Sequence, residues 1–136
     1  AVAYSRALAQ GDPDAARQIG AAYVPYMQAA FARAEQLAID LFGRAIPHVL
    51  VLHANSLNAD HFGALAAMLR QRGYRFISLD DAIRDSAYAS PPGSGGFEGE
   101  SWLENWSRQA GLRPPQQPPV PDFVTRWAGP AAYRGY

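Results

Sequence analysis

Cysteine is absent from this 136-residue chain, so disulfide bonds and thiolate chemistry are excluded. An excess of charge is also lacking, because 12 basic and 12 acidic residues cancel and leave neither a basic stripe nor an acidic tail. No apolar stretch approaches the roughly 20 residues that cross a bilayer. We therefore expect no nucleic-acid partner and no membrane span. What is present, 49% apolar and 18% charged residues, is typical of one globular domain or part of one.

Several catalytic signatures are missing as well. The chain has no G-x-S-x-G for a serine hydrolase and no G-x-x-x-x-G-K for a phosphate loop. The glycine-rich stretch GSGGFEG (93–99) neither follows a predicted strand nor opens a helix, so we interpret it as a loop. The three histidines include no pair at the spacing of a compact two-ligand motif. The residues by themselves therefore predict no metal site.

Helix signals dominate the N-terminal third. A helix over 1–10 is closed by Gly11, and Asp12 before Pro13 has the chemistry of a helix start. Apolar residues then recur every three or four positions, which predicts one buried helix face: Ile19, Tyr23, Tyr26, Ala30, Ala34, Leu37 and Leu41. Pro25 lies within this pattern, so we expect a kink or a break into two helices there.

A strand, a helix and a second strand are predicted next. The apolar run 47–52 reads as a strand buried on both faces, and YRFISL at 74–79 supplies the second strand. Asn58 caps the helix 59–72 between them, Gly73 is expected to end it in the left-handed region, and Asp80 caps a short helix after them. This order predicts an α/β fold with two parallel strands. Two strands do not make a self-sufficient sheet, so the pattern indicates an incomplete fold.

The composition changes after Ser90. A Pro, Gly and Ser-rich loop leads into a short helix, with Ser101 as cap, Glu104 completing a capping box and Gly111 as stop. The following LRPPQQPPVP is typical of an extended polyproline segment. The terminal residues 122–136 show no clean period, and we expect them to be loosely docked or disordered.

His53 is the strongest candidate for a functional residue. It directly follows the apolar run, at the carboxyl end of a predicted strand, where the ligands of α/β folds gather. With period two it shares a face with Val51, so it could protonate a leaving group while Val51 lines a small pocket. The alternative is a structural histidine bonded to a backbone group. Asn58 and Asp60 are explained by the helix start, and His61 is expected on the helix surface.

A longer stretch resembles a known family. IPHVLVLHANSLNADHFGALAAMLRQRGYRFISLDDAIRDSAYA is similar to the end of the NodB-homology domain of polysaccharide deacetylases, carbohydrate esterase family four. The resemblance is carried by the Val51-Leu52-His53 motif, by the helix after it and by GYRFISLDDAIRD. The flanking YMQAAFARAEQLAIDLFGR and SWLENW fit the same surroundings. It covers residues 1–111 as one domain segment and leaves the Pro-rich tail, 112–136, outside.

The resemblance implies a fold and a reaction. The fold is a distorted (β/α) barrel, of which this chain would be an incomplete C-terminal segment, and the reaction is metal-dependent N-deacetylation of amino sugars. In that family a divalent metal, usually zinc, activates the attacking water and an aspartate acts as base. By resemblance, His53 is the general acid that protonates the departing amine, and Val51 takes the place of a leucine that lines the acetyl pocket. The implied substrate is an acetylated polysaccharide or oligosaccharide, and the implied location is extracytoplasmic, either periplasmic or secreted.

The chain also departs from the family pattern. The Thr-Phe-Asp-Asp segment and the His-x-x-x-His metal motif are absent, and Ala54 stands where many members have an acidic residue. We therefore expect this chain to hold no metal, to be inactive alone and to depend on the missing N-terminal half of the barrel. Two alternatives stay open. One is a non-catalytic α/β carbohydrate-binding or interaction module, with Trp102 and Trp106 recognising the sugar; the other is a degenerate deacetylase that has lost its metal ligands.

Overall fold

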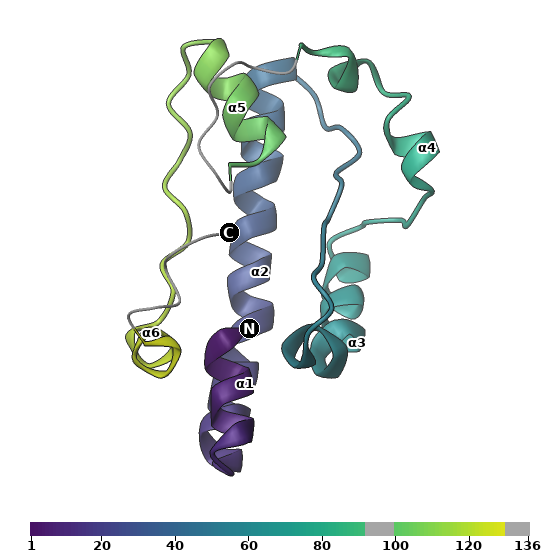
Figure 1. Ribbon diagram of the computed structural model, residues 1–136. Coiled ribbons are helices and arrows are strands. Elements are labelled where there is room, and N and C mark those ends of the chain that lie inside the picture. The colour runs from purple at the N-terminus through teal and green to yellow at the C-terminus, as the bar shows by residue number, and fades with distance from the viewer. Residues whose placement is uncertain (92–99, 130–136) are drawn as a thin grey trace. The chain divides into compact units, whose positions relative to one another are not determined.

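The computed structural model describes residues 1–91 and 100–129, and all of their regular structure is helical (Figure 1). The glycine-rich loop predicted at 93–99 lies outside these residues. The helices are α1 Val2–Ala9, α2 Pro13–Phe42, α3 Ser56–Gln71, α4 Leu79–Ala82, a 3₁₀ helix Ser86–Ala89, α5 Trp102–Gln109 and α6 Asp122–Ala128. None is long and apolar enough, within the described ranges, to cross a membrane.

The chain divides into two compact units, and α2 contributes residues to both. The first unit holds residues 1–29, 51–75 and, among those described, 118–129. The second unit holds residues 30–50 and 76–117. Each unit is described separately below.

The predicted α/β fold is wrong for the described part of the chain. Segments 47–52 and 74–78 are extended but form no ladder with any described neighbour, so no parallel strand pair and no segment of a (β/α) barrel is present there. The physical reason lies in the apolar side chains, because Val49, Leu50 and Val51 are exposed at successive positions. A strand buried on both faces needs neighbouring strands and covering helices, and high β propensity does not replace them.

The long amphipathic helix forms as predicted, but it is not broken at Pro25. Asp12 caps its start, since its Oδ1 accepts a hydrogen bond from the Ala15 backbone amide at 2.9 Å. Ile19 and Leu37, at opposite ends of the predicted face, are both buried. Proline removes a single intrahelical hydrogen bond, and the apolar face on either side of it keeps α2 continuous.

The first unit is built from closely packed small residues. Helices α3 and α6 both pack against α1 (Figure 1). The buried cluster consists of Ala3, Tyr4, Ala7, Ala15, Ala16, Ile19 and Leu57, with Tyr23, Phe123, Val124, Trp127 and Ala128 partly buried around it. The last four of these show that residues 122–128 of the terminal segment, expected to be loosely docked or disordered, form α6 and dock through an apolar face.

The second unit is built from aromatic rings and charged pairs. Here α5 lies beside the C-terminal part of α2 (Figure 1), and Phe42 meets Trp106 edge-on at 5.8 Å between ring centroids. The predicted capping box of α5 is confirmed, with Ser101 and Glu104 bonding each other's backbone amides. The Arg33 guanidinium donates to Glu104 Oε1 and to the Pro115 carbonyl, both at 2.7 Å. This arginine therefore ties the Pro-rich segment to α5.

Two helix starts lie a few residues before their predicted positions. Asn55, rather than Asn58, caps α3, and Ser78, rather than Asp80, caps α4. The C-terminal end of α3 is as predicted, because Gly73 has φ +88°, in the left-handed region that favours glycine.

Candidate functional site

His53 lies at the end of the extended apolar run, immediately before α3, and it is exposed. Its backbone carbonyl accepts hydrogen bonds from the side-chain amides of Asn55 at 3.2 Å and Asn58 at 2.8 Å. The Asn55 Oδ1 in turn accepts from the Asn58 backbone amide at 2.9 Å, which closes the N-terminal cap of α3. The two asparagines therefore fix the backbone that carries His53, a role that their sequence pattern did not reveal.

Val51, the other predicted site residue, is 75% exposed. A side chain that lines an acetyl pocket must be enclosed by other groups, and none encloses it among the described residues. Its exposure continues that of the preceding Val49 and Leu50. The extended run thus presents apolar surface up to the position of His53.

His61 does not lie on the helix surface as predicted. Its ring is half-buried between the rings of Tyr4 and Tyr23, at centroid distances of 5.7 and 6.3 Å, both edge-on. It also approaches Gly20 of α2 so closely that a Cβ there would overlap the imidazole. His61 is therefore a packing residue of the first unit and is not brought together with His53. The sequence signal for this close packing was Gly20 itself, because a glycine inside a helix costs about 1 kcal/mol relative to alanine.

The same tyrosines join α3 to α1 and α2 through their hydroxyl groups. Tyr4 donates to Asp60 Oδ2 at 2.9 Å, and Tyr23 donates to Asn58 Oδ1 at 2.6 Å. The hydrogen bond to Asp60 raises the pKa of Tyr4, and burial raises the pKa of Tyr23. Asn58 consequently links Tyr23 to the carbonyl of His53. The position of His53 depends in this way on the packing of three helices.

A metal ion of the kind that the resemblance implies does not fit the described residues. No three His, Cys, Asp or Glu side chains gather closely enough in these ranges to hold one. His61 faces tyrosine rings, and burial lowers the pKa of His48, partly opposed by the Glu35 carboxylate. Within the described ranges His53 therefore belongs to no metal-binding group, and it lies at an exposed position.

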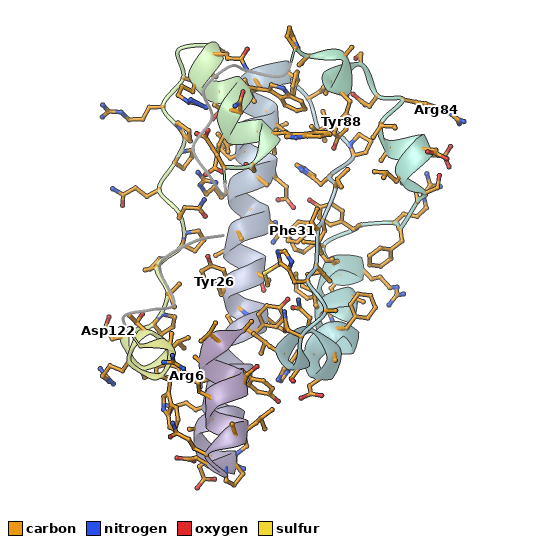
Figure 2. The ribbon with its side chains drawn as sticks, viewed as in Figure 1. Arg6, Tyr26, Phe31, Arg84, Tyr88 and Asp122 are labelled. Atoms are coloured by element: carbon orange, nitrogen blue, oxygen red, sulfur yellow. The ribbon has the colours of Figure 1, made fainter. Side chains whose placement is uncertain are left out.

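Tryptophans form the other candidate surface, in the second unit. Trp106 is 8% exposed and belongs to the interior, whereas Trp102 is 61% exposed. The Tyr88 ring contacts both edge-on, at 5.7 and 5.8 Å, and lies beside α5 (Figure 2). Of the two rings predicted to recognise a sugar, only Trp102 offers a large open surface.

Comparison of the chain with protein-family models, with curated proteins and with solved structures finds no match.

Proposed function

We propose that this chain supplies the general acid, His53, to a metal-dependent N-deacetylase of acetylated polysaccharides. The observation that carries the proposal is the setting of His53, which is exposed beyond an apolar run and held through its carbonyl by two asparagine amides. A buried structural histidine would lack that exposure, and an unrestrained loop histidine would lack the anchored backbone. The similarity of the Val51-Leu52-His53 motif to the deacetylase family gives the proposal its reaction.

The proposed step is a proton transfer to nitrogen. Water adds to the acetamide carbonyl and gives its proton to a base outside this chain. As the C–N bond breaks, the electron pair goes to the sugar nitrogen, and the His53 imidazolium donates the proton that makes it a neutral amine. Acetate and the free amino sugar remain. General acid catalysis of this type contributes about 10²–10⁴-fold in rate.

The metal ligands and the base must then come from a partner polypeptide segment. The exposed apolar run is the surface that we assign to it, because Val49, Leu50 and Val51 are 41, 37 and 75% exposed. Covering these side chains would contribute roughly 25 cal/mol for each Å² of apolar surface removed from water. A partner that covers this run would also place its own residues next to His53.

A reconstitution experiment tests the proposal. The chain is mixed with a separately expressed deacetylase N-terminal segment that carries the Asp-Asp and paired-histidine motifs and has no closing histidine. Deacetylation of an acetylated chitooligosaccharide should require both pieces and fall about 10²–10⁴-fold for His53→Ala, with binding of the two pieces unchanged. Ser56→Ala, a matched exposed change, should leave the rate unaltered. Equal activity of the wild type and the His53 variant would refute the role of His53.

The chain alone should neither deacetylate nor bind zinc in a one-to-one complex, because one histidine does not replace three ligands. Calorimetric zinc titration measures this directly. Tight stoichiometric binding lost on both His53→Ala and His61→Ala would contradict the proposal.

The exposure of Trp102 favours a second candidate, a carbohydrate-binding module without catalysis. In that case the chain alone should bind an acetylated chitooligosaccharide, and Trp102→Ala should abolish binding while His53→Ala leaves it intact. Titration of the chain and its two variants with the chitooligosaccharide therefore separates the two candidates.

A further inference from the structure

The first unit contains an open hollow of about 610 Å³ that none of the features above uses. Its lining residues are Arg6, Gln10, Gln18, Phe123, Arg126 and Trp127, drawn from α1 and its C-cap residue, from α2 and from α6. Two of these are guanidinium groups, two are amides and two are aromatic rings. None of the described residues that line it is a carboxylate, so this lining carries positive charge in a chain whose total charge is zero.

Arg6 is fixed in place at this hollow. Its Nη1 donates to the carbonyls of Trp127 and Ala128, the last residues of α6 (Figure 2 shows Arg6 beside α6). A guanidinium has five N–H donors, and this arrangement uses only those on Nη1. These two carbonyls hold the guanidinium in place, so its Nε and Nη2 donors can bind an anion with little further loss of side-chain entropy. A bidentate anion site requires such a fixed pair of donors.

The other lining groups narrow the chemistry of the ligand. Phe123 and Trp127 stand one helical turn apart on α6 and offer apolar ring surface, while Gln10 and Gln18 offer amide donors and acceptors suited to hydroxyl groups. A simple phosphate ion would use only the arginines. A neutral sugar would use only the amides and rings.

We infer that this hollow binds a carboxylate-bearing sugar, a hexuronate or an acidic polysaccharide residue of that class. The carboxylate pairs with Arg6 and Arg126, the hydroxyl groups bond to Gln10 and Gln18, and a ring face packs on Trp127. The site lies in the first unit and does not depend on the role of His53. It would fail or stand independently of the deacetylase proposal.

Calorimetric titration of the full chain with sodium glucuronate, with glucose and with inorganic phosphate tests the inference. Glucuronate should bind at least tenfold more tightly than either of the others. Arg126→Gln should weaken glucuronate about tenfold, as expected for loss of a charge-assisted hydrogen bond. Arg75→Gln, which removes another exposed charge of the first unit, should have no effect.

Gln18→Ala provides a second variant that keeps both charges. It should weaken glucuronate and leave phosphate binding unchanged. The inference is overturned if phosphate binds as tightly as glucuronate, if glucose does so, or if the Arg126 and Arg75 variants behave alike while circular dichroism shows both to be folded.

Discussion

The two units of this chain are stabilised by different means. The interior of the first is made of alanines and a few larger side chains, cross-linked by two neutral tyrosine hydroxyls. The second joins its helices through aromatic edges and through ion pairs such as Arg33–Glu104 and Arg44–Asp85. Small residues allow close helix approach and are sensitive to added volume, whereas charged pairs respond to pH and salt.

The distribution of perturbed side chains follows the same division. The described side chains with a lowered pKa, His48, Asp85 and Glu104, all belong to the second unit. In the first unit the shifted side chains are Tyr4 and Tyr23, whose pKa values are raised. The second unit is therefore the one whose stability should depend on pH on the acid side.

Trp106→Ala should cause the largest difference in stability between the two units. Removal of a buried indole costs about 3–5 kcal/mol, and here it also removes the edge contacts with Phe42 and Tyr88. Hydrogen exchange should show loss of protection in the second unit, with the first unit much less affected. Trp102→Ala, at a largely exposed position, should cost far less. Equal loss of protection in both units would show that they unfold together.

Glu104→Gln should have the next largest effect on the free energy of unfolding. Burial raises the pKa of Glu104, but hydrogen bonds from Ser101 and the guanidinium of Arg33 outweigh it, so the net pKa is lowered. A carboxylate with a lowered folded pKa adds stability that is present above its unfolded pKa of about 4.3 and lost as pH falls below it. The substitution should therefore cost about 1.5–3 kcal/mol in urea unfolding at pH 7 and progressively less as the pH falls through the lowered pKa of Glu104 in the folded state. A cost independent of pH would contradict this account.

Protonation of His48 should cause a second loss of stability, at a higher pH than the loss due to Glu104. Burial lowers its pKa, so the neutral form favours the folded state and stability falls as pH drops through and below the ordinary histidine value of about 6.5. His48→Gln should flatten the pH dependence of unfolding between pH 7 and pH 5, while wild type should lose stability over that range. An unchanged slope in the variant would assign the step to another group.

The effect of Gly20→Ala on stability should change sign according to the residue at position 61. In the wild type the new Cβ overlaps the imidazole of His61, and we expect a loss of about 1–2 kcal/mol from overpacking in the first unit. In a His61→Ala background the same change should gain up to about 1 kcal/mol from helix propensity. Urea unfolding of the four proteins forms a double-mutant cycle. Additive effects would show that the two residues do not meet.

Arg84→Ala should have the smallest effect. Its partner is Asp81, with 76 and 55% of the two side chains exposed, and exposed pairs of this kind contribute roughly 0–0.5 kcal/mol. Arg33→Ala, in a pair only 12 and 11% exposed, should cost several times more when measured in the same urea titration. Similar costs for the two variants would remove the distinction between buried and exposed charge in the second unit.

Local signals in the sequence predicted local structure well. The cap at Asp12, the capping box of Ser101 and Glu104, and the left-handed Gly73 are confirmed because each depends on residues a few positions apart. The strands failed because they need partners that are distant in the chain or outside it. Helix α6 was missed because its seven residues make too few turns for a helical period to be recognised. It is stabilised by docking on α1, which the local sequence does not reveal.

Only part of the candidate site has a local signal in the sequence. The prediction of His53 as a functional residue rests on the abrupt end of an apolar run, and the structure shows this residue to be exposed. Its anchoring by Asn55 and Asn58 could not be predicted, since it depends on where α3 begins. The packing of His61 against Gly20 depends on contact between two helices far apart in the chain. The arginines of the hollow gave no local pattern, because α1 and α6 stand at opposite ends of the sequence.

The placement of the tryptophans makes the chain its own optical reporter. Trp127 is in the first unit, while the exposed Trp102 and the buried Trp106 are in the second. Replacing the latter two with phenylalanine leaves a single emitting indole whose spectrum follows the first unit alone. Replacing Trp127 instead leaves a pair in which acrylamide should quench Trp102 readily and Trp106 poorly. Each unit can thus be followed by its own fluorescence, without an attached dye.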